Sequence, residues 1–414
     1  MNWGYGVNLR GNIQLSKETN KLTILDLIRK SKTPISRADI TRITGLTNPT
    51  ISSMVAELME ENLVVEVGLG ETIVGRRPIL LDFNPGGRAI AGVVIDYPGV
   101  TIGITDLGGK ILVKRPIDVN LAGGARPEVI LQKIGQELKA FIEEWEMNGP
   151  KIWGTGVALT GGVNGRTGIC IESRSLNWIN VPVKELLEPW ARPPLHVANN
   201  IRCMILGEKW FGVAQDEKDI VGIRFGKRVG SGIIIDDNIL EGSRGMAGEI
   251  GHLTVDPNGI ECFCGNRGCL RNYVTEDSIL ARLHLLAEGG DEQAKLLLTK
   301  LKSIQPGFML KFLKRIAEDG HELSERIISD LISNLGFAIA NLIKSFNPTM
   351  VVLLNEDRSF AESLAEEVIL KVDPLVELLS NLSVNIVAGQ LGEDAHMVGA
   401  SALALDSIFK TSMV

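Results

Sequence analysis

Three of the five cysteines in this chain of 414 residues lie within one short segment, and a histidine precedes them. The segment reads HLTVDPNGIECFCGNRGCL, from His252 to Leu270. The N-terminal sequence MNWGYGVNLRGN has no charged region followed by an apolar one, and no apolar run approaches the roughly 18 residues of a membrane span. We therefore expect a cytoplasmic protein. In reducing cytosol, clustered cysteine and histidine more often bind metal or catalyse a reaction than form a disulfide.

Charge is distributed unevenly along the chain. The first 82 residues are almost balanced, so the remainder carries the acidic excess behind the net charge of −7. Only the first segment therefore suits a polyanionic partner, although its charge alone is weak evidence. The length and a hydrophobic content of 44% predict two or three domains.

The first segment has the pattern of a helix, a tight glycine turn and a second helix. Apolar spacing predicts a helix over residues 17–31, and Ser36 and Gly45 bound a second, shorter helix. A third helix begins with Thr47 as its N-cap and Pro49 in its first turn, and its apolar residues fall on one face. Its short polar side chains can approach base edges in a major groove. These candidate DNA contacts are Thr47, Asn48, Thr50, Ser52 and Ser53.

The next stretch, LVVEVGLGETIVGRRPILLDF, predicts two short strands around a basic turn, which is the shape of a wing. Arg76 and Arg77 lie in this turn, where two guanidinium groups can enter a narrow minor groove. An ordinary three-helix bundle is the alternative interpretation of the helices. The wing favours a winged helix-turn-helix that binds double-stranded DNA.

From Ala89 the sequence takes an α/β pattern. AIAGVVIDYPGVTIGITDLGGKILVKR predicts three successive strands, and a helix over about 127–145 precedes the strand KIWGTGVAL and the glycine-rich loop TGGVNGRTG. A second unit begins at DIVGIRFGKRVGSGIIIDDNIL and closes with the helix LISNLGFAIANLIKSF and the strand MVVLL. This repetition predicts two related lobes with a cleft between them.

The run AGEIGHLTVDPNGIECFCGNRGCL resembles the signature of the ROK family of repressors, open reading frames and sugar kinases, and the N-terminal segment resembles its repressor branch. The likeness covers nearly the whole chain. It implies a multidomain protein: a winged helix-turn-helix over residues 1–83, then a two-lobed, actin-like (ribonuclease-H-like) α/β domain over 84–200 and 201–414. The C-terminal helix would return to the first lobe.

The resemblance also implies a structural zinc ion. Its ligands would be His252, Cys262, Cys264 and Cys269. Three thiolates and one imidazole form a closed tetrahedral set, as is usual for structural zinc, and the alternative is a group of unligated core cysteines. We interpret Cys170 and Cys203 as ordinary buried thiols.

Kinase chemistry is not retained in the motifs. The general base of ROK kinases is the Asp of an Asn-Asp pair, and Asn200 stands at that place in HVANNIRCMILGEKW. A carboxamide cannot accept the hydroxyl proton. The phosphate loops DxGGT and LGTGIGGG appear as DYPGV from Asp96 and as FGKRVGSG, and the glycine run on the adenosine side is replaced by Leu354, Asn355 and Glu356. We expect no ATP-dependent catalysis; the alternative is a sugar kinase that also binds DNA.

A sugar-binding cleft is implied by Asn199, Glu249 and His252, which match the family's sugar contacts. The family usually has Glu where GCLRNY has Arg271. Two alternatives follow: Arg271 pairs with Glu249 and shapes the pocket, or it binds an anionic ligand such as a sugar phosphate or sugar acid. Asn200 could then contact the ligand itself. For Trp178, a core or hinge role is favoured over stacking on a sugar ring.

These observations predict a homodimeric or tetrameric transcriptional repressor of carbohydrate catabolism genes. Its partners would be a DNA operator and a small sugar, polyol or sugar phosphate that changes its affinity for DNA. A third alternative is an architectural DNA-binding protein whose cleft binds nothing.

Overall fold

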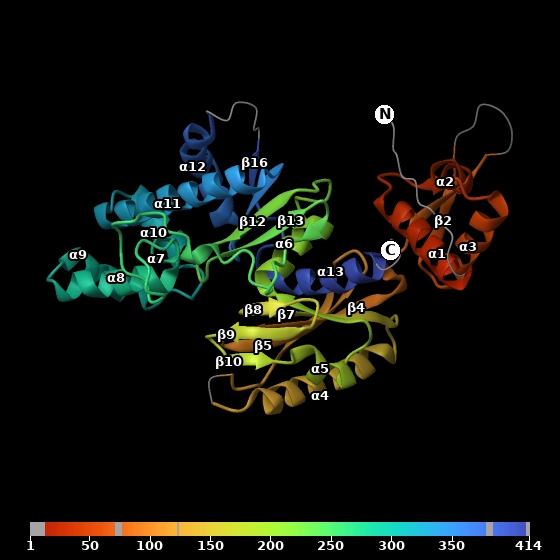
Figure 1. Cartoon of the computed structure of the whole chain (residues 1–414), viewed down its shortest axis with the longest axis horizontal. Coiled ribbons are helices and arrows are strands. Elements are labelled where there is room, and N and C mark those ends of the chain that lie inside the picture. Colours follow the sequence, from red (N-terminus) through yellow and green to blue (C-terminus); the bar gives the residue numbers. More distant parts are fainter. Residues whose placement is uncertain (1–12, 71–76, 122–123, 378–383, 411–414) are drawn as a thin grey trace.

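The computed structural model describes residues 13–70, 77–121, 124–377 and 384–410. Figure 1 shows a small N-terminal winged segment beside two larger α/β lobes, with helices α6 (Asn200–Phe211) and α13 (Ala395–Lys410) between the sheets of the lobes. The domain boundaries near residues 83 and 200 stay a prediction.

The winged segment contains three helices and a three-stranded antiparallel sheet of order β1-β3-β2. Ser36 and Asp39 form a capping box at the start of α2, and Gly45 ends this helix in the left-handed conformation, with φ of 70°. Thr47 caps α3 by accepting a hydrogen bond from the Thr50 amide. The elements are α1 (Ile13–Lys30), β1 (Ile35–Ser36), α2 (Arg37–Thr44), α3 (Asn48–Glu60), β2 (Val64–Leu69) and β3 (Ile79–Phe83).

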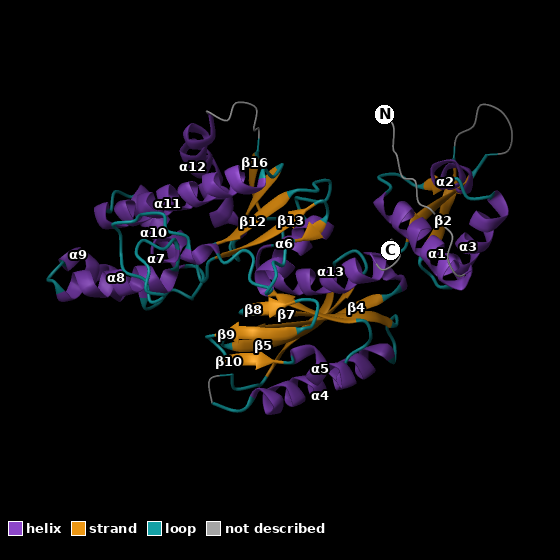
Figure 2. Cartoon of the chain, viewed as in Figure 1, coloured by secondary structure: helices purple, strands orange, loops and turns teal. Residues whose placement is uncertain are grey.

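The first lobe, lobe 1, has a five-stranded sheet of order β11-β7-β4-β5-β6. Three strands are antiparallel neighbours, and two more extend the sheet in parallel: β4 (Ala89–Asp96), β5 (Gly99–Asp106), β6 (Ile111–Ile117), β7 (Ile152–Leu159) and β11 (Leu195–Asn199). Helices α4 (Pro127–Glu146) and α5 (Val183–Leu187) cover one face, as Figure 2 shows. A small sheet of β8 (Gly162–Asn164), β9 (Ile169–Ser173) and β10 (Trp178–Val181) lies beside it.

The second lobe, lobe 2, repeats this arrangement. Its sheet has the order β14-β13-β12-β15-β16, again three antiparallel neighbours followed by two parallel strands. The strands are β12 (Ile220–Arg224), β13 (Gly230–Ile235), β14 (Asn238–Ile239), β15 (Met350–Leu354) and β16 (Asn385–Ala388). The predicted repetition of two related α/β lobes is therefore confirmed.

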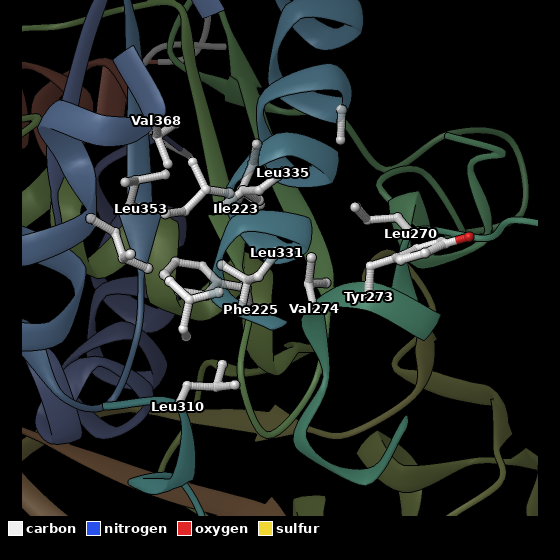
Figure 3. Close-up of a cluster of buried hydrophobic side chains, with 14 of the residues drawn as sticks. Ile223, Phe225, Leu270, Tyr273, Val274, Leu310, Leu331, Leu335, Leu353 and Val368 are labelled. Carbon is white, nitrogen blue, oxygen red and sulfur yellow. The ribbon is translucent and has the colours of Figure 1, made fainter. Parts of the chain in front are cut away.

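In the described chain, lobe 2 contains the helices α7 (Arg271–Val274), α8 (Glu276–Glu288), α9 (Glu292–Leu301), α10 (Met309–Glu318), α11 (Glu322–Phe346) and α12 (Arg358–Val376). Figure 3 shows Leu331 and Leu335 of α11 against Phe225 and Leu353 in its core. Among the described helices, α11 alone is long and apolar enough to cross a membrane, but 61% of its most apolar window is buried inside the protein. That burial is typical of a core helix.

Helices α6 and α13 approach each other closely because glycine stands at the contact. A Cβ atom on Gly399 of α13 would lie 2.0 Å from the carbonyl oxygen of Cys203 in α6. A Cβ atom on Gly156 of β7 would lie 1.7 Å from the Ala400 carbonyl oxygen, so α13 also lies directly on the sheet of lobe 1. The C-terminal helix thus connects three parts of the molecule.

The winged segment shares a core with this helix pair. Leu25 and Ile28 of α1 belong to the same buried cluster as Leu405 and Phe409 of α13. The guanidinium carbon of Arg29 lies 4.2 Å from the ring centroid of Trp210 in α6 and 5.3 Å from that of Phe409. Cation–π contact at these distances adds to the apolar packing.

We expect Gly399→Ala to destabilise the protein by about 1–3 kcal/mol, because the added methyl group overpacks the α6–α13 contact. A thermal unfolding scan measures the effect. Gly289→Ala is the matched control, since a Cβ there would meet its nearest atoms at an ordinary 3.4 Å. Equal melting temperatures for both variants would contradict the importance of this contact.

Candidate functional site

The cysteine segment forms a compact cluster in lobe 2. The ligand atoms of His252, Cys262, Cys264 and Cys269 all lie within 4.8 Å of one another. The Sγ atoms of Cys264 and Cys269 are 3.6 Å apart, which is far longer than the bond of about 2.05 Å in a disulfide. The cluster can hold a metal ion. The three cysteines of the cluster are free thiols, so they form no disulfide with one another.

His252 reaches the cluster through one ring nitrogen. Its Nδ1 atom lies 3.7 Å from the Cys262 sulfur, and the residue ends a short 3-10 helix, Ile250–His252. The Nε2 atom on the opposite side of the ring remains for another partner. Burial lowers the pKa of His252, and the nearby charges of Arg271 and Arg174 lower it further, so the imidazole is held in the neutral form that binds metal.

The expected sugar contacts begin at the start of α6, where two asparagines differ in their surroundings. Asn199 caps the helix: its Oδ1 accepts from the Ile201 and Arg202 amides, and its Nδ2 donates to the Gly161 carbonyl at 2.7 Å. Asn200 is only 2% exposed, and its Nδ2 has no hydrogen-bond partner among the described residues. Asn199 therefore has a structural role, while Asn200 keeps an unused donor.

Glu249 precedes the short helix of His252. Its carboxylate is accessible to solvent, yet it lies deep among protein atoms, and desolvation raises its pKa. The charge of Arg202 opposes this effect, and that of Glu172 reinforces it. No ion pair within the described chain includes Glu249. It remains a partly desolvated acceptor.

Arg271 contacts an aromatic ring in this structure. It forms no ion pair with Glu249; its guanidinium carbon lies 4.2 Å from the ring centroid of Phe263, in the cysteine loop. Arg174, at the end of β9 in lobe 1, lies 4.8 Å from the same ring. Both alternatives for Arg271 stay predictions. Sequence reasoning missed Arg174, which belongs to no motif, and Phe263, which lies between two candidate metal ligands but cannot itself bind metal.

Charged side chains from both lobes meet at the loops that the sequence analysis compared with the family's phosphate loops. Arg224, at the end of β12, is fully buried and hydrogen-bonds to Glu356, while its Nη2 lies 3.9 Å from Asp96 of lobe 1. Arg228 lies 3.4 Å from the same carboxylate. Burial favours the neutral form of Glu356, yet the charge of Arg224 prevails and lowers its pKa to about 2. We call these four residues the interlobe ion network.

His396 begins α13 beside this network. It is buried, and its Nε2 has no hydrogen-bond partner in the described chain. Burial lowers its pKa to about 4, and the charge of Arg224 contributes in the same direction. No motif in the sequence singles out this position.

We expect the protein to lose stability as the pH falls from 6.5 to 4, because His396 is buried in its neutral form. In the unfolded chain the imidazole binds its proton near pH 6.5, whereas in the folded protein it stays neutral until about pH 4. Over this range the unfolded state binds more protons than the folded state. The free energy of unfolding therefore decreases as the pH decreases, by about 3 kcal/mol in total.

Unfolding measured across this pH range should show a flatter dependence for His396→Gln. His284→Gln is the control, because His284 is exposed on α8. If both variants kept the slope of the parent protein, His396 would not be its source.

The winged segment presents the polar face of α3. Thr47, Asn48, Ser52 and Ser53 are exposed, and Thr50 is half-buried. Asn48 accepts a hydrogen bond from the Thr41 hydroxyl at 2.9 Å, and its amide N–H groups remain for another acceptor. Strands β2 and β3 pair as the predicted hairpin, and Arg77 is exposed just before β3. Arg76 lies outside the described residues.

Comparison with known proteins agrees with this arrangement. The ROK family model matches residues 95–407, and the IclR helix-turn-helix domain model matches residues 20–68. The chain belongs to the ROK family. It is 28% identical to the xylose repressor of Caldicellulosiruptor bescii over 96% of this chain and 98% of that protein.

Two solved structures extend the likeness. A ROK family transcriptional regulator, a homologue of the Escherichia coli MLC protein, has a TM-score of 0.76 and 25% identity, covering 96% of this chain and 98% of that one. A ROK family glucokinase from Streptomyces griseus has a TM-score of 0.60 and 24% identity, covering 77% of this chain and 99% of that one, and shares the two-lobed fold. The predicted winged helix-turn-helix followed by an actin-like ROK domain is confirmed.

Proposed function

We propose that this ROK protein is a sugar-responsive transcriptional repressor of carbohydrate catabolism genes in the cytoplasm. The observation that carries the proposal is the single core in which α1 of the winged segment, α6 and α13 meet. A DNA-binding module is thereby packed directly on the helix whose first residues line up with the expected sugar contacts. The xylose repressor with similarity over nearly the whole length supports the same function.

DNA recognition would use α3 in the major groove and the wing beside it. Helix-turn-helix proteins usually read palindromic half-sites as dimers, so we propose a homodimer on a two-fold symmetric operator. The test is selection of genomic fragments by the purified protein, followed by footprinting. Recovery of one protected palindrome near carbohydrate genes supports the proposal, and absence of any sequence preference contradicts it.

We expect Arg77→Ala to weaken operator binding and to reduce the slope of log affinity against log salt by about one, because one phosphate-neutralising charge is lost. Fluorescence anisotropy at several salt concentrations measures both quantities. Arg358→Ala is the control, since Arg358 is half-exposed at the start of α12 in lobe 2 and pairs with Glu362. If Arg77→Ala behaved like this control, the wing would make no phosphate contact.

The cleft would act as a sensor without kinase activity. The buried Arg224 and its carboxylate partners fill the phosphate position with fixed charges of both signs, and Asn200 cannot act as a general base. An ADP-release assay with a panel of sugars separates this proposal from a DNA-binding kinase. Neither the parent protein nor Asn200→Asp should release ADP, because restoring the base leaves the interlobe ion network in place.

A change in the cleft would reach the DNA-binding segment through α6. This helix starts at the asparagine pair and ends at Trp210 and Phe211, which contact the shared core. The Glu208 carboxylate fixes its far end by accepting hydrogen bonds from the Val213 and Leu391 amides at 3.1 and 2.9 Å. An effector that favours one arrangement of the lobes would therefore bias the position of the winged segment.

The metal would be a structural zinc ion. With Zn–S bonds of about 2.3 Å, tetrahedral geometry requires sulfur atoms about 3.8 Å apart, close to the 3.6 Å between Cys264 and Cys269. Three sulfurs and one nitrogen complete four-fold coordination, so His252, Cys262, Cys264 and Cys269 would hold the ion and leave no position for a reacting water. Zinc would fix the loop that carries Phe263.

We expect Cys264→Ser to release the zinc and lower the melting temperature, because metal binding contributes directly to folding. Elemental analysis gives the metal content per chain. Cys203→Ser, at a buried thiol outside the cluster, is the control and should keep its metal. One zinc per chain in Cys264→Ser would show that the ligand set is wrong.

A further inference from the structure

Two arginines from different lobes converge on one aromatic ring at the expected effector site. Arg271 approaches Phe263 from α7 of lobe 2 at 4.2 Å, and Arg174 approaches it from the end of β9 in lobe 1 at 4.8 Å. The His252 ring meets the same Phe263 ring edge to face, with centroids 5.4 Å apart. Phe263 is 60% exposed, so this arrangement is open to solvent.

These guanidinium groups have donors to spare. Within the described chain Arg271 forms no ion pair or hydrogen bond through its side chain, and its guanidinium carbon lies over the Phe263 ring. Arg174 bonds to Glu172 through Nε at 2.9 Å, which leaves both of its terminal nitrogens available. A guanidinium stacked on a ring keeps its N–H groups in the plane, where they can form a bidentate contact with a carboxylate or phosphate.

A second observation also points to a ligand at this site. Asn200 is buried, and its amide nitrogen has no partner, although an unsatisfied buried donor is costly. Glu249 is solvent-accessible, and no ion pair within the described chain includes it, so its carboxylate is free to accept hydrogen bonds. A ligand with hydroxyl groups would hydrogen-bond to both the Asn200 amide and the Glu249 carboxylate. Polar clefts recognise carbohydrates through hydrogen bonds of this kind.

A neutral sugar would satisfy only part of this set. It offers hydroxyl groups to Glu249 and Asn200, but it leaves Arg271 without a counter-charge and leaves the terminal nitrogens of Arg174, which pairs with Glu172 through Nε, unused. The ion pairs elsewhere in the protein show the contrast, because Arg224 and Arg192 each have a carboxylate partner within the chain. Arg271 has no carboxylate partner within the described chain. It also stands at the position where the resemblance to the family predicts a glutamate.

We propose that the effector is an anionic carbohydrate whose carboxylate or phosphate is bound by Arg271 and Arg174, while Glu249 and Asn200 contact its hydroxyl groups. This inference rests on the proposed function, which supplies a small carbohydrate effector. Because Arg174 and Arg271 belong to different lobes, the anionic group would also join the lobes at this edge of the cleft. That contact provides the differential affinity that a ligand needs to shift the lobe arrangement.

The experiment compares matched compounds on the full-length, zinc-loaded protein by thermal shift and isothermal titration calorimetry. Each of D-glucose and D-xylose is paired with its aldonic acid and its terminal phosphate, and inorganic phosphate alone is included. We expect an acid or a phosphate to raise the melting temperature and its neutral parent to have little effect. The acid and phosphate arms identify which anion is recognised.

Variants separate the roles of the two arginines. Arg174→Ala and Arg271→Ala should each weaken binding of the anionic compound about tenfold or more, because each removes a charge-assisted contact. Arg271→Glu should lose the anionic compound altogether. Arg267→Ala is the control, since Arg267 lies in the same loop and pairs with Glu261 instead.

Several results would overturn the inference. One is a neutral sugar that binds the parent protein more tightly than its anionic derivatives, and another is anion binding that is unchanged in both arginine variants. If Arg271→Ala loses zinc, Arg271 serves the thiolates; Arg174→Ala, which lies outside the metal loop, then decides the result. No stabilisation by any compound would also reject the inference, while the operator selection would still test the proposed repressor independently.

Discussion

The close contact between α6 and α13 is the constraint on which the rest of the structure depends. Glycine at Gly399 and Gly156 lets α13 lie against α6 and against the sheet of lobe 1, and no larger residue would fit without displacing backbone. The C-terminal half of α13 then supplies Leu405 and Phe409 to the core of the winged segment. The DNA-binding module therefore packs on the two helices that lie between the lobes, and any movement of these helices changes its surroundings.

The interlobe ion network joins the two lobes through charged side chains. Arg224 is fully buried, and such a charge requires paired carboxylates to offset its desolvation. Asp96 comes from lobe 1 while Arg224, Arg228 and Glu356 come from lobe 2, so the interlobe ion network spans the cleft with the protein's own charges. In a kinase, bound nucleotide contacts both lobes from this position. Here side chains would join the lobes permanently, and the proposed sugar contacts would be the part that responds to a ligand.

The sequence predicted local features well because their causes are local. The capping box at Ser36, the turn at Gly45 and the spacing of Cys262 and Cys269 each depend on a few neighbouring residues, and the structure has the helices and the cluster that they indicate. The repetition of strands and helices was also sufficient to predict two related lobes. Family resemblance assigned the N-cap residue Asn199 to sugar binding, although its side chain is largely used by the backbone.

Contacts between distant segments could not be predicted in this way. Arg224 and Asp96 are far apart in sequence, and nothing in either motif indicates that they face each other. Arg174 meets Phe263 only because the lobes place β9 beside the cysteine loop, and the contact of Arg271 with the same ring was not among the alternatives that the sequence offered. Side-chain choice among several nearby partners depends on tertiary geometry, which no single-sequence pattern contains.

The central claim is that the cleft and the DNA-binding segment are coupled through α6 and α13. The most direct measurement is the operator dissociation constant with and without a saturating cleft ligand, in the parent protein and in Trp210→Ala. The account predicts a ligand-dependent change in the parent protein that is much smaller in Trp210→Ala, although both proteins still bind the ligand. An operator affinity that is independent of bound ligand in the parent protein, or an equal change in both proteins, would contradict it.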